Sequence, residues 1–340
     1  MKNTILFLSL IFIPLSAWAT CVVEFQTSGS DLSLRESNSN LMVDLHQDGR
    51  FFPLDEVYKE LKMPVLYQVQ NYVHADKDTG YDDRYIKYYH YARILEFLNE
   101  KSEQFEKNGY QTQTIGKSLS GRDLMAVFPK KLDPTKKLIV MFGRHHGDEG
   151  TANWIIEGFV NEFFNRVETL KNYQLVLYPM VNPDGAENQV RYNNNRRDLN
   201  RVWANDSRQS KDEVQFIHTH LSDLVLSKGL KPVITLDMHG SFDEDFIYRV
   251  GRSTFGQAYY ETQQTFIDEL GTLDPWQAAN FILSEGEPGM ARIRLAKLHG
   301  WHTLTHETPR DIPLRNSRNR TMQSLIDQGV AALDTIETLY

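Results

Sequence analysis

The feature of the sequence that most constrains its fold is an uninterrupted apolar run, Leu138–Phe142, which leads into the polar stretch Gly143–Gly150. Residues 151–166 follow with apolar side chains at helical spacing. A continuous apolar run of this length is typical of a strand that is buried on both faces. The three segments therefore predict a strand–loop–helix unit, with the loop at the carboxyl end of the strand.

The same alternation continues from Tyr85 to the C-terminus. Further strands are expected at 111–115, 124–128, 175–181, 232–237, 246–250 and 302–306. Further helices are expected at 88–105, 212–226 and 322–339, and a turn at 182–185. Strands that alternate with helices predict an α/β fold, in which a mixed, mainly parallel sheet is flanked by helices.

The first 19 residues differ from the rest of the chain. Lys2, an apolar core and the small residues Ala17 and Ala19 predict a secretory signal peptide, which is too short for a stable membrane span. Its removal leaves Cys21 as the only cysteine, so no internal disulfide is expected, and lipid attachment at Cys21 stays an open question. We expect an exported protein, located in the periplasm of a bacterium.

The chain after the signal peptide divides into two predicted parts. Residues 20–84 form an N-terminal segment of unknown role, with candidate strands at 51–54 and 65–69 and a charged hinge at 76–83. Residues 85–340 form the main α/β domain. The chain of 340 residues is 41% hydrophobic, which allows a large core, and its net charge of −8 argues against nucleic acid as a partner.

The stretch Gly143–Gly150 contains a candidate metal site. A histidine and a carboxylate three residues apart, at the end of a strand, can turn toward one point in space. Imidazole nitrogen together with carboxylate oxygen suits zinc. Two registers are open at this stage, His146 with Glu149 and His145 with Asp148.

Other polar residues follow the later predicted strands. His239 comes directly after the strand 232–237 and can supply a third ligand, which leaves the fourth position open, as in catalytic zinc sites. The stretch Arg191–Arg201 is rich in donors suited to a carboxylate or an oxyanion. Glu307 follows the apolar strand 302–306, where a carboxylate can act as a general base.

Taken in order, these segments resemble the zinc carboxypeptidases of the carboxypeptidase A type, over roughly Tyr85 to Tyr340. Upstream, Ile115–Ser118 with Gly121 and Arg122 resembles the segment that opens that catalytic domain. The matching motifs are Gly143-x-x-His146-Gly147-x-Glu149, Asn182-Pro-Asp-Gly185, Arg191-x-Asn193 leading to Asp198-Leu-Asn-Arg201, Asp237-x-His239 and Glu307.

The resemblance implies a role for each matching residue. One zinc ion per chain would be held by His146, Glu149 and His239. Asp198 would orient the ring of His146, as metal-bound histidines usually require. Glu307 would be the base that takes a proton from the attacking water and passes it to the leaving amine.

The remaining matches concern the substrate. Arg191 would stabilise the tetrahedral oxyanion, and Asn200 with Arg201 would bind the free carboxylate of the terminal residue. The tyrosine that caps the substrate in the digestive enzymes has no counterpart between Val250 and His306. Tyr259 and Tyr260 lie too far upstream for this role.

Two departures from the family concern specificity. The stretch Ser284–Arg292 is expected to be a flexible, charged loop, in which Arg292 or the following Arg294 contacts an additional substrate carboxylate. Arg196 and Arg197 make the loop before Asp198 more basic than usual. The preferred substrate side chain therefore cannot be copied from the digestive enzymes.

The sequence predicts a secreted zinc metallocarboxypeptidase that hydrolyses an amide bond beside a free carboxylate, with peptides or peptidoglycan muropeptides as substrates. One alternative is a zinc-dependent deacylase of N-acyl amino acids, of the aspartoacylase or succinylglutamate desuccinylase type. The signal peptide and Asn182–Gly185 favour the peptidase. Another alternative is a zinc-containing binding protein without catalysis, against which the presence of Glu307 and Arg191 argues.

Overall fold

The computed structural model describes residues 86–204, 212–242, 244–310 and 320–340, together with the backbone of five short strands before residue 54. The chain divides into two compact units, Met1–Asp82 and Asp83–Tyr340. The first unit contains the antiparallel pair β1 (Gln26–Thr27) and β2 (Ser30–Asp31) and the antiparallel sheet of β3 (Ser33–Ser37), β4 (Asn40–Asp44) and β5 (Phe52–Pro53). The expected signal peptide, Cys21, the candidate strand 65–69 and the hinge 76–83 lie outside the described residues.

The second unit is built on one eight-stranded sheet, in the order β12-β11-β13-β10-β8-β9-β7-β6. Its strands are β6 (Tyr110–Lys117), β7 (Asp123–Pro129), β8 (Lys137–Gly143), β9 (Tyr173–Tyr178), β10 (Pro232–Ser241), β11 (Phe246–Arg249), β12 (Phe281–Leu283) and β13 (Thr303–Pro309). The central strands β9, β8, β10 and β13 are mutually parallel, whereas the pairs β6/β7, β7/β9 and β11/β13 are antiparallel. The predicted α/β fold with a mixed, mainly parallel sheet is therefore confirmed.

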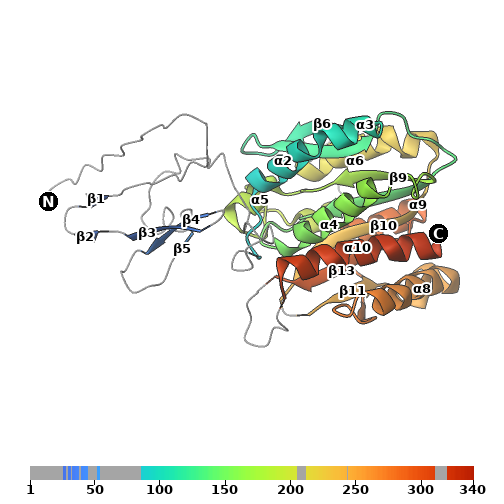
Figure 1. Ribbon diagram of the computed structural model, residues 1–340. Helices are drawn as coiled ribbons and strands as arrows, with labels where there is room; N and C mark the ends of the chain where they lie inside the picture. Colours follow the sequence, from blue (N-terminus) through green and yellow to red (C-terminus); the bar gives the residue numbers. More distant parts are fainter. Residues whose placement is uncertain are drawn as a thin grey trace. The chain divides into compact units, whose positions relative to one another are not determined.

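Helices cover both faces of this sheet (Figure 1). The helices are α2 (Tyr91–Glu100), α3 (Ser102–Lys107), α4 (Thr151–Asn165), α5 (Pro183–Asn188), α6 (Glu213–Leu224), α7 (Arg252–Phe255), α8 (Gln257–Leu273), α9 (Ala291–His299) and α10 (Met322–Leu339), with 3-10 turns at Leu199–Arg201 and Leu226–Lys228. Helices α4 and α10 lie side by side on one face, in front of the sheet in Figure 1. None of the described helices is long and apolar enough to cross a membrane.

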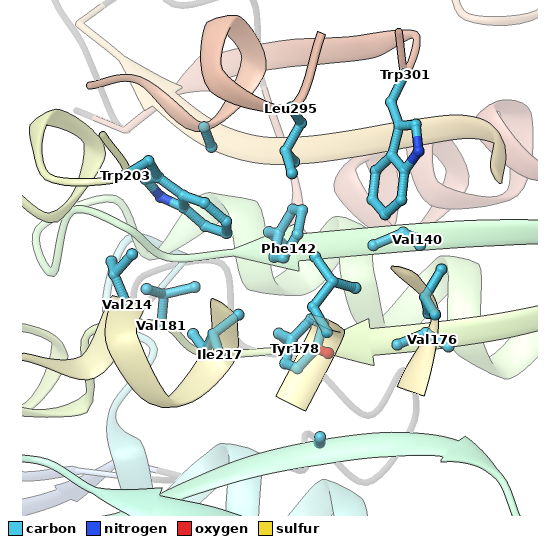
Figure 2. Close-up of a cluster of buried hydrophobic side chains, with 14 of the residues drawn as sticks. Val140, Phe142, Val176, Tyr178, Val181, Trp203, Val214, Ile217, Leu295 and Trp301 are labelled. Carbon is cyan, nitrogen blue, oxygen red and sulfur yellow. The ribbon is translucent and has the colours of Figure 1, made fainter. Parts of the chain in front are cut away.

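The core on the opposite face of the sheet contains side chains from α6 and α9 (Figure 2). Leu138, Val140 and Phe142 alternate along β8 and point into this cluster, while the intervening residues point to the other face. Trp203 and Trp301 pack against the same cluster. Because every residue of β8 after Lys137 is buried, the strand is a rigid support for the loop that follows it.

Close contact between α4 and α10 depends on small residues. A Cβ atom built on Gly158 would stand 2.1 Å from the backbone oxygen of Ile326, and one on Gly329 would stand 2.1 Å from that of Ile155. Only glycine leaves room for the two backbones at this distance. Helix α10 also begins with a capping box, in which Thr321 and Ser324 exchange side-chain and backbone hydrogen bonds.

Two expected elements differ in form. The helix expected at 88–105 is divided near Lys101 into α2 and α3, where the Ser102 hydroxyl donates to the Asn99 carbonyl and competes with the helical pattern. The turn expected at Asn182–Gly185 is the start of the short helix α5. Pro183 occupies its first position and the Asn182 side chain accepts from the Gly185 backbone N–H, both of which favour a helix start.

Other expectations near the site need correction. His239 lies inside β10 rather than after it, and β13 continues past Glu307 to Pro309. The reason is that the two strands pair with each other along their polar ends. The stretch expected to be a flexible loop at 284–292 already enters helix α9 at Ala291, so Arg292 is a helical residue. Helix α8 was not expected, because few of its residues are buried and its apolar pattern is sparse.

Candidate active site

The site lies where the polar ends of β8, β10 and β13 meet. These strands are neighbours in the sheet, and their register places His239 opposite Glu307 and Met238 opposite Gly143. The loop after β8 therefore starts beside the end of β10. Parallel strands bring their carboxyl ends to one edge of a sheet, which is where open α/β sheets bind ligands.

The loop after β8 is held in one conformation from inside. Arg144, which is fully buried and has a φ of 62°, donates from Nε and Nη2 to the Gly147 carbonyl at 3.0 and 2.7 Å. Its Nη1 donates to the Asn153 side chain on α4 at 3.0 Å. A Cβ atom on Gly147 would stand 1.9 Å from the carbonyl carbon of Gly185, so the loop requires glycine there.

This loop supplies two of three possible metal ligands, His146 and Glu149, and β10 supplies the third, His239. His146 Nδ1 lies 2.7 Å from Glu149 Oε1, His239 Nδ1 lies 2.9 Å from Glu149 Oε2, and the two Nδ1 atoms lie 3.2 Å apart. All three residues are buried, with exposed fractions of 4% or less. Burial raises the pKa of Glu149, but the adjacent His146 and His239 rings together lower it well below its usual value.

The donor set fits zinc. Tetrahedral zinc with bonds of about 2.1 Å needs ligand atoms roughly 3.4 Å apart, which is close to these separations. The Nδ1 atoms of both imidazoles face the same carboxylate, an arrangement that a shared cation would satisfy. His146, Glu149 and His239 are thus the residues among those described that would hold the metal.

The other ring nitrogen of each histidine faces a carboxylate. His146 Nε2 lies 3.0 Å from Asp198 Oδ1, and His239 Nε2 lies 3.1 Å from Asp237 Oδ2. Oδ2 of Asp237 is buried and, in the described part of the chain, has no hydrogen-bond partner of its own. A proton on His239 Nε2 would satisfy it and leave Nδ1 free for a metal, which is the usual arrangement around metal-bound histidine.

Glu307 is the carboxylate opposite this cluster. It lies on β13, is 9% exposed and is paired in register with His239. Burial, followed by the negative charge of Glu149, raises the pKa of the Glu307 carboxyl to about 7 in the metal-free protein. A carboxyl with a pKa near neutrality can both accept and release a proton under physiological conditions.

Arg191 lies at the open side of the cluster, with a side chain that is 33% exposed. Its Nε and Nη2 donate to Asp198 Oδ2 at 3.1 and 2.7 Å. Its Nη1 lies 3.1 Å from His146 Nδ1 and 3.7 Å from Glu149 Oε1. Asp198 therefore holds both the ring of His146 and the guanidinium of Arg191, and the nearby cations keep its pKa below the usual range despite burial.

A pocket of about 350 Å³ opens beside these residues, and Asn200, Arg201 and Arg292 contribute to its lining. Asn200 Oδ1 accepts from the Ala291 backbone N–H at 2.9 Å, and its Nδ2 lies 3.2 Å from His239 Nε2. Arg201 forms an ion pair with the exposed Glu287 at 3.1 Å. The structure thus brings the predicted substrate-binding residues to the same pocket as His146, Glu149 and Glu307.

The two residues of the other possible ligand pair, His145 and Asp148, have other contacts. His145 is fully buried and does not line the pocket, because its ring lies between Asp237 and Trp203 and contacts both. Asp148 forms an ion pair with Arg310 instead of joining a ligand cluster with His145.

Sequence reasoning assigned no role to Asp237 or to Tyr248. Asp237 lies two residues before His239 on the same face of β10, a spacing that could have indicated its contact with the ring. Tyr248 lines the pocket from β11. Tyr259 does not line it, and its hydroxyl donates to the Trp301 carbonyl at 2.8 Å. Nothing in the local sequence distinguishes Tyr248 from an ordinary strand tyrosine.

The buried cluster of two histidines and one glutamate, at the edge of a mixed α/β sheet, has the donor pattern of catalytic zinc sites. The family model described as zinc carboxypeptidase matches residues 94–265, about half of the chain, and this protein belongs to that family. The predicted family is thereby confirmed, and the predicted enzyme class, a metallocarboxypeptidase, is the one that this family describes.

Individual relatives are distant. Human cytosolic carboxypeptidase 2 is 22% identical over 279 residues, which cover 77% of this chain and 31% of the relative, so the chain spans about a third of its length. The metallo-carboxypeptidase from Burkholderia cenocepacia has a TM-score of 0.61 at 21% identity, with 72% of this chain and 68% of that chain covered. The metallo-carboxypeptidase from Pseudomonas aeruginosa, solved in complex with (2-guanidinoethylmercapto)succinic acid, has a TM-score of 0.60 at 22% identity, with 73% and 68% covered. These structures show that the fold is shared.

Proposed function

We propose that this protein removes the C-terminal residue from peptides, with His146, Glu149 and His239 as the ligands of one zinc ion. The observation that carries the proposal is the convergence of these three donors, of which His146 and Glu149 line the same pocket as Glu307. Zinc held there would supply Lewis-acid polarisation of the scissile carbonyl and of a water molecule.

The residues of the chain supply the remaining chemistry. Glu307 accepts a proton from the attacking water and passes it to the leaving amine, a role supported by its burial beside the ligand cluster. Arg191, whose Nη1 points to that cluster, stabilises the negative charge that develops on the carbonyl oxygen. Asn200 and Arg201 bind the free carboxylate of the terminal residue from the pocket wall.

Arg292 supports a preference for an acidic terminal residue. It is 4% exposed, donates to the Ser284 carbonyl and hydroxyl at 3.0 and 3.1 Å, and lies over the Tyr248 ring at 5.5 Å. No carboxylate of the described residues forms an ion pair with it, and burial lowers its pKa. A buried cation without a counter-ion is unfavourable, and a substrate carboxylate would supply one.

Peptidoglycan peptides contain residues with a second carboxylate, and they are the substrate class that we propose. The predicted export of the chain to the periplasm belongs to the same proposal, because muropeptides occur there. Arg292 is the pocket residue suited to the second carboxylate, whereas Arg294, two residues further along α9, does not line the pocket.

The first experiment tests the general base. Glu307→Gln keeps the shape of the side chain, so we expect it to retain zinc and to lose at least about 100-fold in kcat, as removal of a general base does. Zinc content is measured by metal analysis and turnover by mass spectrometry of the released residue. Undiminished turnover in the zinc-loaded variant would remove Glu307 from this role.

The second experiment tests specificity with a matched pair of variants. Arg292→Gln is expected to lower kcat/KM for peptides that end in glutamate by about 10-fold or more, since a hydrogen bond to a charged group contributes roughly 1.5–3 kcal/mol. Peptides with an uncharged terminal residue should lose much less. Arg294→Gln, on the same helix, should leave both substrates unaffected. Equal losses on both substrates in Arg292→Gln would contradict the assignment.

The substrate panel includes muropeptides and N-acyl amino acids. Faster hydrolysis of N-acyl amino acids than of peptides would identify the protein as the deacylase instead. Absence of hydrolysis from every substrate, with zinc fully loaded, would favour a binding protein.

A further inference from the structure

His145 is a buried histidine beside a predicted zinc ligand, and the proposed chemistry does not use it. It is fully buried, and both of its ring nitrogens have partners. Nε2 lies 3.0 Å from the indole Nε1 of Trp203, and Nδ1 lies 2.8 Å from Asp237 Oδ1. These contacts connect His145 to the carboxylate that faces His239.

Trp203 determines which nitrogen of His145 carries the proton. An indole N–H can only donate, so it donates to Nε2 of His145. The neutral ring then carries its own proton on Nδ1 and donates it to Asp237 Oδ1. The buried pair of aromatic rings thereby supplies one directed hydrogen bond to Asp237.

The Asp237 carboxylate, which His145 holds through Oδ1, also contacts His239. Its second oxygen, Oδ2, lies 3.1 Å from His239 Nε2. Asn200 also approaches that nitrogen, at 3.2 Å, through Nδ2, because its Oδ1 accepts from the Ala291 backbone N–H. An amide nitrogen donates hydrogen bonds and does not accept them. Of these two described neighbours of His239 Nε2, Asp237 is the one that can accept a hydrogen bond from a proton on Nε2, which leaves the lone pair of Nδ1 facing Glu149.

His145 is not itself well placed to be a ligand. By distance alone, His145, Asp237 and His239 form a second group that could hold a metal ion. Both nitrogens of His145 are already bonded, however, and its ring stacks parallel to that of His239, with centroids 5.4 Å apart and an interplanar angle of 3°. An ion bound there would have to break the contact with Trp203 or with Asp237.

We propose that His145, held by Trp203, is a positioning residue that fixes the Asp237 carboxylate and, through it, the metal-binding tautomer of His239. The inference rests on the proposed function, in which His239 holds zinc. Loss of an outer hydrogen-bond partner of a metal-bound histidine lowers metal affinity by about 10–100-fold. Because His145 acts one residue further out, we expect the lower end of that range.

The test measures the zinc dissociation constant of the folded protein by competition with a chelator. His145→Phe keeps an aromatic ring but removes both nitrogens, and it is expected to weaken zinc binding by about tenfold. His145→Gln, whose amide N–H can donate to Asp237, should regain part of the affinity. His220→Phe is the matched control, because His220 is a half-buried histidine bonded to the Tyr178 hydroxyl at 2.9 Å, away from the site.

A second variant separates positioning from packing. Trp203→Phe removes the indole N–H and keeps an aromatic ring, so we expect it to weaken zinc binding. If Trp203 had only a packing role, the substitution would lower the unfolding free energy and leave the zinc affinity unchanged. In the Asp237→Ala background, His145→Phe should have no further effect on zinc affinity, because its target is gone. Unchanged zinc affinity in folded Trp203→Phe would overturn the proposal, whether or not the His145 variant folds.

The outcomes also separate this inference from the proposed function. Zinc affinity of His145→Phe within about twofold of the wild type overturns the inference, given the size of such effects. Loss of zinc as complete as in His239→Ala overturns it too, because His145 would then be a ligand. If His239→Ala itself binds zinc like the wild type, the proposed zinc site is wrong.

Discussion

The metal-free protein offers a sharp test of the environment of Glu307. Burial and the charge of Glu149 raise the pKa of the Glu307 carboxyl to about 7, from the usual 4.5. Each pKa unit corresponds to about 1.4 kcal/mol, so the shift corresponds to roughly 3 kcal/mol in favour of the protonated form. The folded protein thus binds this proton more tightly than the unfolded chain.

The sign of the effect on stability follows from this difference. The contribution of Glu307 to the unfolding free energy is fully present below about pH 4.5, where the carboxyl is protonated in both the folded and the unfolded state. This contribution is lost as the pH rises to about 7. Glu307→Gln has no carboxyl to ionise and keeps its stability. Between pH 4.5 and 8, metal-free wild type should therefore lose up to about 3 kcal/mol of unfolding free energy relative to Glu307→Gln.

The assay is urea unfolding of both proteins in the presence of a chelator, at pH 5 and at pH 8. His146 and His239 titrate in both proteins, so the difference between the two proteins isolates Glu307. Glu103→Gln, on an exposed position of α3, is the control and should show the same difference at both pH values. The reasoning is refuted if Glu307→Gln and wild type differ by the same amount at pH 5 and pH 8.

Three further predictions concern the supports of the site and of the fold. Asp198→Asn should weaken zinc binding by about 10-fold or more in a chelator competition, because His146, a proposed zinc ligand, loses the carboxylate partner of its ring. Gly147→Ala should abolish zinc binding in metal analysis, because its Cβ would stand 1.9 Å from the Gly185 carbonyl carbon. Glu157→Leu should lower the unfolding free energy in urea by about 3 kcal/mol, because the buried Arg93 loses the partner now 2.7 Å away and keeps the more exposed Glu96 and Glu100.

The prediction from sequence was accurate where one segment carries its own pattern. The apolar run Leu138–Phe142 could be recognised as a buried strand, and the apolar face of residues 322–339 matches α10. Both segments have apolar residues at a regular spacing, and burial of that pattern against a neighbour is what stabilises the element. The order of the motifs along the chain was sufficient to indicate the family.

The prediction failed where pairing with other strands overrides the local pattern. The polar ends of β10 and β13, including His239 and Glu307, are in strands because each satisfies the backbone hydrogen bonds of the other. The start of α9 at Ala291 was missed because a short helix with charged residues on several sides has no clear apolar stripe. Arg292 consequently appeared to be a loop residue, whereas α9 holds it at the pocket wall.

The sequence by itself determined the alternation of strands and helices, the residue types of the site and the family, because these depend on spacing along the chain. Only the tertiary structure decided which atoms meet. His145 reaches Asp237 across 92 residues, and His146 reaches Asp198 across 52. Such contacts depend on the register of neighbouring strands and on the loops between them, and no local pattern encodes them. The same is true of Arg292, whose burial without a counter-ion follows from the packing of α9 beside Tyr248.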